Sequence, residues 1–396
     1  MKNKFDLVVL IHRLYYGGEP KKGGLDLVLD QIVARGFRVL IVEYPIDYQI
    51  YQVVKVSTLD SNGKECLLSI KMPIKNNFLD WFLELLFSVY FSIKFKLFGC
   101  AVISSDPLST LPALFLRKIG FFSFHYYHSV DYSLTRFANP TLNSFYKFLF
   151  ELGARNADLV GVVTPKAEER IKSIKVHNII CIPNSPDFDY CTRFRKDIRQ
   201  RASNTMVVTC SEVSYKYKIY ELVELLSVLK RDFKNSTLKV VGYFDPSDSY
   251  CQSLLQLVEG KNLGDSVVFC GHVDRDLNMD IIGSAYIGLA FYDNSFSHIG
   301  YGDSLKIREY AALGLPTVSD KTTPTSDELE KEKAGFTVDS FGEAYEKISL
   351  LMSDPKLYAD CSRNALGWAK KVDKRVVVKN LLKTLRLNKP NDKQNY

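Results

Sequence analysis

The sequence has little that would indicate a metal-binding or disulfide-stabilised protein. Its 396 residues include eight cysteines, but no two of them form a Cys-x-x-Cys pair, and their spacings follow no short regular pattern. Zinc knuckles and disulfide scaffolds need such spacings, so we exclude both and expect reduced, mostly buried thiols. The chain also has no low-complexity tract, so it can bury cores of normal size. Its length predicts two domains of roughly 180 residues each.

Long hydrophobic runs are also scarce. The apolar run in the N-terminal stretch MKNKFDLVVLIHRLYY covers only about six residues, which is too short for the core of a signal peptide. We therefore expect a cytoplasmic location.

The longest apolar run, residues 78–98 (FLDWFLELLFSVYFSIKFKLF), contains Asp80, Glu84, Lys94 and Lys96. A charge at the bilayer centre costs about 2.5 kcal/mol or more, which argues against a membrane span. We expect a helix packed on a sheet, with a shallow interfacial face as the alternative.

The net charge of +7 is modest, and no nucleic-acid motif accompanies it. Basic residues are denser in the stretch RFRKDIRQR at 193–201 and in the tail from Lys370 to Lys393. Such patches suit an anionic ligand or an anionic membrane surface better than DNA read by sequence, so we expect no nucleic-acid partner.

Buried strands alternate with helical segments along the whole chain, which predicts an α/β fold with two doubly wound, Rossmann-like domains facing a cleft. In the first domain we expect six strands, at 6–11, 37–44, 100–106, 121–128, 158–164 and 178–184. In the second we expect strands at 205–211, 238–244, 266–272, 285–292, 314–320 and 334–339. The predicted divisions are a first domain over 1–186, a linker over 187–202, a second domain over 203–369, and a C-terminal helix with a basic tail over 370–396.

The stretch GYGDSLKIREYAALGLPTVSD, residues 300–320, carries the strongest chemical signal. It follows a strand and opens a helix, so backbone N–H groups near Ser304 could hold a phosphate. Lys306 adds a cation at the same end, and Glu309 lies on the same face, where a carboxylate suits the paired hydroxyls of a ribose. Gly314 supplies the helix stop. The alternative is an ordinary surface ion pair between Lys306 and Glu309.

This stretch resembles the donor-site segment of retaining glycosyltransferases of family 4, in the form K-x-x-E-Y-x-A-x-G-x-P-x-V. Other segments agree in order, so that the resemblance spans nearly the whole chain. They are KKGG, NADLVGVVT, IPNSPD, VVGYF, and VVFCGH followed by AYIGLAFY.

The resemblance implies a GT-B fold, with an acceptor-side domain first, a nucleotide-sugar domain second and a C-terminal helix that crosses back to the first. It implies that a sugar moves with retention from a nucleotide diphosphate sugar to a hydroxyl of a glycan or glycolipid, in surface polysaccharide or glycoconjugate synthesis. Glu309 resembles the ribose-binding Glu, and the phosphate-binding Lys is either Lys216 or Lys218, of which we prefer Lys218. The donor residues implied are Gly23, Gly24, Lys216, Lys218, Tyr301, Gly302, Asp303, Ser304, Leu305, Lys306 and Glu309.

Two departures from the family pattern leave the donor sugar open. Tyr301 stands where many members have a Glu that contacts the sugar, and TCSEVSYKYK lacks the Arg that often precedes the phosphate-binding Lys. Two alternatives therefore remain: a catalytically silent subunit that binds a nucleotide or glycan, and a sugar-nucleotide epimerase on the same fold.

The catalytic set that we expect is His128, Asp131, Lys218 and Lys306. His128 and Asp131, in HYYHSVDY, could orient the sugar and acceptor, and the alternative is a satisfied His and a helix-capping Asp. His125 is expected to be packed.

No metal cofactor is expected, because Lys218, Lys306 and helix N-termini can neutralise the leaving diphosphate. The DxD triplets at 187–189 and 274–276 are read as chance matches. If the acceptor is lipid-linked, we expect peripheral contact with an anionic membrane. The residues expected to make it are Lys71, Lys75, Lys94, Lys96, Arg117 and Lys118.

Overall fold

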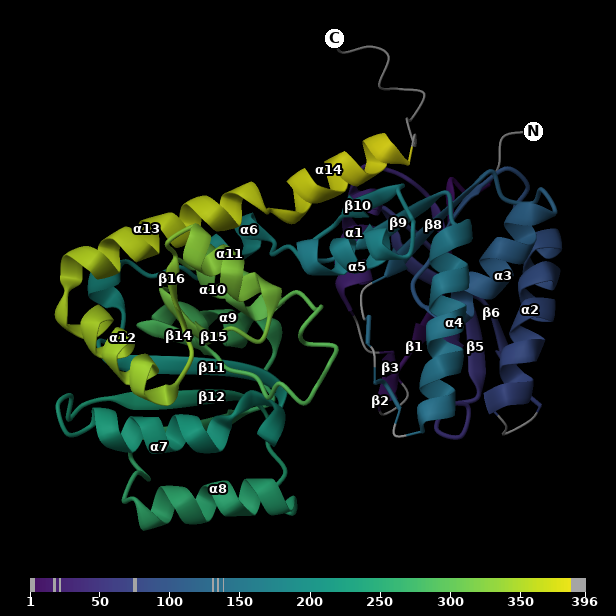
Figure 1. Ribbon diagram of the computed structural model, residues 1–396. Helices are drawn as coiled ribbons and strands as arrows, with labels where there is room; N and C mark the ends of the chain where they lie inside the picture. The colour runs from purple at the N-terminus through teal and green to yellow at the C-terminus, as the bar shows by residue number, and fades with distance from the viewer. Residues whose placement is uncertain are drawn as a thin grey trace, which may run out of the picture. The chain divides into compact units, whose positions relative to one another are not determined.

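The computed structural model describes residues 4–16, 19–20, 23–73, 77–129, 132–133, 135–137 and 139–385. The chain divides into two compact units (Figure 1). The first combines residues 1–183 with 374–396, and the second comprises residues 184–373. All eight cysteines are free thiols, and only Cys66 is exposed.

The first unit contains an eight-stranded sheet in the order β10-β9-β8-β7-β1-β4-β5-β6. The six predicted strands are all present and parallel, with β1 near the centre, because their continuous apolar runs suit burial on both faces. They are β1 (Leu7–Arg13), β4 (Val39–Pro45), β7 (Ala101–Ser104), β8 (Phe124–Ser129), β9 (Leu159–Val162) and β10 (Ile179–Cys181). A separate two-stranded ladder joins β2 (Tyr15–Tyr16) to β3 (Glu19–Pro20).

The prediction of six strands missed an antiparallel hairpin at one edge of this sheet. Strand β5 (Val53–Asp60) pairs with β4 and with β6 (Gly63–Lys71). Strand β6 begins, directly after the turn, with Gly63 at a φ of 111°, a conformation that favours glycine. Most of β6 is exposed, so its residues lack the continuous apolar run by which we recognised the buried strands.

Two groups of helices belong to the first unit. Helix α14 contacts α1, and three of its residues, together with Leu385 just after it, join the same apolar cluster as Leu25 and Leu29. The C-terminal helix therefore belongs to the first unit. Helix α3 contacts both α2 and α4, and Figure 1 shows the three side by side. The helices are α1 (Gly24–Ala34), α2 (Asn77–Lys94), α3 (Pro107–Lys118), α4 (Pro140–Asn156), α5 (Pro165–Ser173) and α14 (Lys374–Thr384).

Helix α2 covers most of the apolar run at 78–98. Within the described ranges, none of the helices combines the length and apolarity needed to cross a membrane. This agrees with the argument made above from the charged residues of this run.

The second unit contains a six-stranded parallel sheet in the order β13-β12-β11-β14-β15-β16, as predicted. Figure 1 shows α7 and α8 on one side of β11 and β12, and α10 and α13 on the other. The strands are β11 (Thr205–Glu212), β12 (Thr237–Tyr243), β13 (Val267–Gly271), β14 (Ile287–Ala290), β15 (Thr317–Asp320) and β16 (Gly335–Val338). The helices are α6 (Phe188–Thr192), α7 (Ile219–Leu229), α8 (Ser249–Gly260), α9 (Arg275–Ser284), α10 (Leu305–Ala312), α11 (Pro324–Lys331), α12 (Phe341–Ser353) and α13 (Pro355–Lys371).

The stretch 187–202, predicted as a linker, lies within the second unit. It forms α6 and a short 3-10 turn, and Arg201 at its end is buried. The Arg201 guanidinium donates to the carbonyls of Leu313 and Gly314, at 2.8 and 2.7 Å, where α10 ends. The last carbonyls of a helix lack intrahelical donors, so this arginine satisfies them and fixes the segment to the unit. Arg201 is therefore not available to an anionic ligand.

Candidate functional site

The N-terminus of α10 offers two unsatisfied backbone donors. Ser304 caps the helix, and its hydroxyl oxygen accepts the N–H of Ile307 at 3.5 Å. The N–H groups of Leu305 and Lys306 have no hydrogen-bond partner in the described part of the chain. First-turn amides are orphans of the helical pattern and carry its positive dipole end, so an anion is a suitable partner for them. Gly314 ends the helix at a φ of 71°, as predicted.

The loop before α10 is held by a buried ion network, which corrects two assignments. Asp303 pairs with Arg308 at 2.9 Å, and neither side chain is exposed. Asp303 also accepts the N–H of Asn184 at 2.6 Å. A donor could not reach this carboxylate, so Asp303 supports the loop and its side chain is not a donor ligand. The amide of Ser304 is occupied as well, because it donates to the hydroxyl oxygen of Thr325 at 2.8 Å.

Glu309 has the opposite character from Asp303. Its carboxylate is half-buried and has no hydrogen bond or ion pair among the described residues. Burial raises its pKa to about 7, although Arg275 and Lys306 lower it. Lys306 does not form the surface ion pair considered above, since its Nζ lies over the Tyr217 ring at 3.8 Å from the centroid. The carboxylate is therefore available to hydrogen-bond donors of a ligand.

Two further lysines lie near these groups. Lys218 has a φ of 48°, and its Nζ pairs with Asp320 at 3.1 Å. The Nζ of Lys216 is 3.3 Å from Nε2 of His298. These lysines follow β11, and Lys306 follows β14, so all three lie beyond the carboxyl ends of parallel strands, where ligands bind in open α/β sheets. The geometry holds both candidate phosphate-binding lysines in defined positions and leaves the choice between them to experiment.

Tyr301 and Gly302 precede this network in the same loop. Both of their N–H groups donate to the carbonyl of His298, at 3.3 and 2.9 Å. A side chain at Gly302 would place a Cβ 3.0 Å from that carbonyl oxygen, so the turn favours glycine there. This contact gives Gly302 a structural role in the loop.

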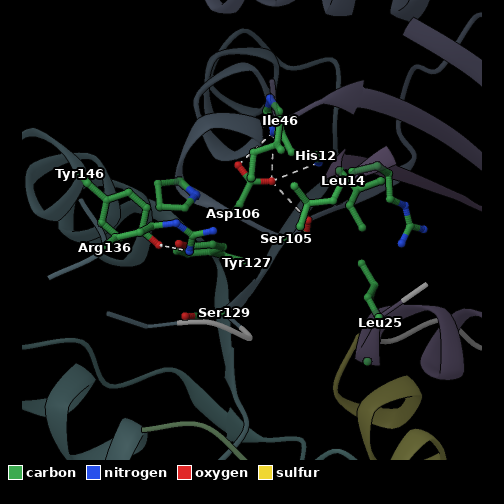
Figure 2. Close-up of a pocket in the computed structure, with 15 residues that line it drawn as sticks. His12, Leu14, Leu25, Ile46, Ser105, Asp106, Tyr127, Ser129, Arg136 and Tyr146 are labelled. Atoms are coloured by element: carbon green, nitrogen blue, oxygen red, sulfur yellow. Dashed lines mark hydrogen bonds and ion pairs between the residues drawn. The ribbon is translucent and has the colours of Figure 1, made fainter. Parts of the chain in front are cut away.

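A separate pocket lies in the first unit (Figure 2). Its volume is about 260 Å³. Figure 2 shows Asp106 beside His12 and Ser105, with Arg136 and Tyr146 at another part of the wall. The pocket is lined by Ile11, His12, Arg13, Leu14, Gly23, Gly24, Leu25, Ile46, Ser105, Asp106, Pro107, Tyr127, Ser129, Arg136 and Tyr146.

The predicted glycine pair contributes to this pocket in two different ways. The N–H of Gly23 donates to the carboxylate of Asp26 at 2.6 Å, and Asp26 also accepts the Arg13 guanidinium at 2.6 Å. The N–H of Gly24, the first residue of α1, has no partner within the described ranges. Of the two glycines, Gly24 therefore offers its amide to a ligand. The space beside Gly23 is open, because a Cβ at this position would meet no atom within 4 Å.

Our sequence reasoning missed a buried histidine between two carboxylates at the pocket wall. His12 Nδ1 lies 3.0 Å from Asp106, and Nε2 lies 3.0 Å from Glu84 of α2. Burial lowers the pKa of His12, but the two carboxylates raise it to about 10. The pKa of Asp106 is lowered by His12 against the effect of burial, while burial raises that of Glu84. His12 is therefore a cation at neutral pH, and Asp106, on the pocket side, is an anion.

The expected role of His128 does not fit its surroundings. His128 is buried, and its Nδ1 lies 2.7 Å from the hydroxyl of Tyr126. Burial lowers its pKa to about 4, so the ring is neutral at pH 7. It does not line the pocket, since alternate residues of β8 point to opposite faces and Tyr127 and Ser129 take the pocket side. The alternative of a satisfied histidine is the one observed.

Other residues of the same segment have separate outcomes. Asp131 lies outside the described residues. His125 is buried against Ser104, with Nε2 2.8 Å from the hydroxyl, as expected for a packed side chain.

The residues that the structure describes include no group of three or more His, Cys, Asp or Glu side chains arranged to hold a metal ion. Asp187 and Asp274, from the DxD triplets, cap α6 and α9.

We predict that His12→Gln destabilises the protein by about 3 to 5 kcal/mol at neutral pH, because it leaves buried carboxylates without their cation. The raised pKa of His12 sets the pH dependence. Its stabilisation is fully present below the unfolded value of about 6.5 and is lost as pH rises toward 10. Urea unfolding across this range should show that decline in the wild type and not in the variant.

The control for this experiment is His177→Gln, at an exposed histidine, which should unfold like the wild type. The double variant His12→Gln/Glu84→Gln should recover part of the lost stability, because it removes a buried charge. Equal stability of His12→Gln and the wild type would contradict the ion network.

Comparison with known proteins bears on the second unit and on the fold. Residues 192–368 match the sequence model of the family "Glycosyl transferases group 1". No curated protein gives a significant match.

Solved structures show the same fold at low sequence identity. Sucrose-phosphate synthase from Thermosynechococcus elongatus is 16% identical, with a TM-score of 0.68 over 96% of this chain and 98% of that one. The trehalose-6-phosphate structure from E. coli, bound with UDP-2-fluoro glucose, is 13% identical, with a TM-score of 0.70 over 97% and 100%. Anabaena HepE, in complex with UDP, is 14% identical, with a TM-score of 0.67 over 96% and 99%.

These structural matches and the two doubly wound sheets show that the protein has the GT-B fold, and the sequence match shows that residues 192–368 form a domain of the glycosyl transferases group 1 type.

Proposed function

We propose that this protein is a glycosyltransferase that moves a sugar from a nucleotide diphosphate sugar to a hydroxyl of a glycan or glycolipid, with retention, in the synthesis of a surface polysaccharide or glycoconjugate. The observation that carries the proposal is the first turn of α10. There the amides of Leu305 and Lys306 lie on the same short helix as the carboxylate of Glu309, and none of the three has a hydrogen-bond partner among the residues that the structure describes. The amides suit an anionic group of a ligand, and the carboxylate suits a pair of hydroxyl groups.

The donor would bind in the second unit with its diphosphate at the N-terminus of α10. Lys306 and either Lys216 or Lys218 would contribute cations, and Glu309 would accept hydrogen bonds from the ribose. HepE and the E. coli structure hold UDP and a UDP sugar respectively. A uridine nucleotide is therefore the first ligand to test.

The chemical contribution of this site would be to stabilise the departing diphosphate. Preorganised donors and cations aimed at developing charge are usually the largest catalytic term. His128 is buried and does not line the pocket, so this scheme assigns it no proton transfer. The cations already present make a metal-free reaction our proposal, and product anomer analysis by NMR would test retention.

One residue favours a second candidate function. Tyr301 occupies the position of a sugar-contacting Glu in many family 4 members, which is consistent with a subunit that binds nucleotide and does not transfer sugar. Nucleotide binding without donor hydrolysis or transfer to any acceptor would favour this candidate, whereas turnover of a donor would exclude it.

We predict that Glu309→Ala weakens nucleotide-sugar binding by about 1.5 to 3 kcal/mol, the range for hydrogen bonds to a charged group. Because the pKa of Glu309 is about 7 in the free protein, the wild type should bind more weakly as pH falls below 7. The expected slope approaches roughly tenfold per pH unit if only the ionised form accepts the ribose hydroxyls. Calorimetry with a UDP sugar across this range measures both effects.

Glu309→Gln removes the charge of the side chain and keeps its size. The affinity of this variant for the nucleotide sugar should therefore not change with pH, which separates the effect of the charge from that of the side-chain shape. Glu346→Ala, at a residue of α12 outside the site, is the matched control. Unchanged affinity in a folded Glu309→Ala variant would contradict the ribose assignment.

We predict that Lys306→Ala and Lys218→Ala each lower turnover by roughly 10² or more, by analogy with the removal of one preorganised donor. Lys321→Ala is the control, because Lys321 is exposed and pairs with Asp339 away from α10. Initial rates of donor consumption would measure the loss. Activity that EDTA abolishes and Mn²⁺ restores would overturn the metal-free part of the proposal.

A further inference from the structure

Helix α2 differs from an ordinary surface helix because it buries a row of polar residues. Asp80, Glu84, Ser88 and Ser92 recur at every fourth position, and each is at most 2% exposed. Their partners lie in the interior: for example, Glu84 binds His12, and Ser88 lies 2.6 Å from the hydroxyl of Tyr44. A surface helix normally buries its apolar stripe and exposes its polar face. In α2 the polar row is the buried one.

The outward face of α2 is correspondingly apolar. Leu79, Phe82, Leu86, Tyr90 and Ile93 are spaced three or four residues apart, so they form one stripe, and they are between 46% and 63% exposed. Neither acidic residue of the helix reaches this face, since Asp80 and Glu84 are both buried. An exposed apolar surface of this extent marks a binding surface.

The neighbouring helices extend this surface. Helix α3 contacts both α2 and α4, and Figure 1 shows all three in one layer. Phe115 on α3 and Ile119 just after it are 43% and 51% exposed. On α4, Phe145 and Phe148 are 44% and 60% exposed. We call the outward faces of α2, α3 and α4 the helical layer.

Charge distinguishes the occupants that this layer could accept. Beyond the two buried acids of α2, its helices contain one acid, Glu151, which pairs with Arg155 and Arg170 at 3.2 Å. The exposed cations are Lys94, Lys96, Lys118, Lys147 and Arg155, of which Arg155 pairs with Glu151. A second copy placed symmetrically on this face would set lysines against lysines. An anionic lipid surface instead accepts apolar side chains at the acyl boundary and lysines among its headgroups.

We propose that the helical layer docks on the surface of an anionic membrane. The stripe of α2 would enter the headgroup and acyl boundary, with its axis in the membrane plane, and Lys94 and Lys96 would contact lipid phosphates or carboxylates. The inner face of the same helix supplies Glu84 to His12, which contacts Asp106 at the pocket. Docking would therefore place a lipid surface on the helix that backs the pocket. The proposal is independent of the reaction that the protein catalyses.

Vesicle co-sedimentation of the full chain tests this directly. We expect binding to vesicles of phosphatidylcholine with phosphatidylglycerol at low salt, much weaker binding at high salt, and little binding to phosphatidylcholine alone. Only two tryptophans are present. Trp81 packs against the core of the first unit and Trp368 is buried in the second, so a tryptophan placed on the exposed stripe by Phe82→Trp should add a blue shift of emission on binding.

Matched variants separate the contributions of charge and apolar area. Lys94→Glu/Lys96→Glu and Phe82→Gln/Leu86→Gln should each weaken vesicle binding by roughly tenfold or more. The controls are Lys331→Glu/Lys356→Glu and Leu277→Gln, which change exposed residues of the second unit and should bind like the wild type. Glu309→Ala should also bind vesicles normally, so a failure of the donor-site proposal is distinguishable from a failure of this one.

Three results would overturn the proposal. One is absence of binding to anionic vesicles at low salt by a protein whose circular dichroism is native. The second is equal binding to neutral and anionic vesicles, which would remove the role of the lysines. The third is a dimer in light scattering that Phe82→Gln/Leu86→Gln dissociates, which would assign the helical layer to contact between copies.

Discussion

Buried charges must be paired, because an isolated ion loses its hydration and gains nothing in return. This constraint shapes the loops at the carboxyl ends of both sheets. In the second unit, Asp303 and Arg308 hold the entrance to α10. In the first, Asp106 and Glu84 enclose His12 at the pocket wall. Each network uses its charges to fix backbone, and the groups left without partners beside it are the ones that a ligand can engage.

The same constraint explains why the buried side of α2 carries a row of polar residues. Its acids and serines meet partners such as His12 and Tyr44 inside the unit, so the polar row has to point inward. The apolar residues of the opposite face, from Leu79 to Ile93, are then left exposed, whereas Phe91 of the same helix is buried in the core. Exposing them costs free energy unless another surface covers them, because burial of apolar area is favourable. An inward polar row and an outward apolar stripe are thus two results of one packing arrangement.

The parts of the fold that the sequence predicts well are those with continuous apolar strands, such as β1 and β14, because burial on both faces leaves a local signature. The hairpin of β5 and β6 was missed, since β6 is exposed and has no such run. The His12 network was missed for a different reason: its partners lie 72 and 94 positions away, and only the fold brings them together. His128 was assigned to the site because it lies at the end of a predicted strand, but strand alternation turns it to the other face.

Asp303 and Glu309 show what sequence resemblance alone cannot separate. Both are acids in one loop and helix of a recognisable motif, six residues apart in the sequence. Asp303 accepts from Arg308, Asn184 and Thr325, so binding a donor would require breaking bonds already made. Glu309 is half-buried with no such bonds, and its desolvation is a cost that a ligand's hydroxyl groups would offset. Hydrogen-bond satisfaction, more than proximity to the motif, therefore decides which acid is open to a ligand.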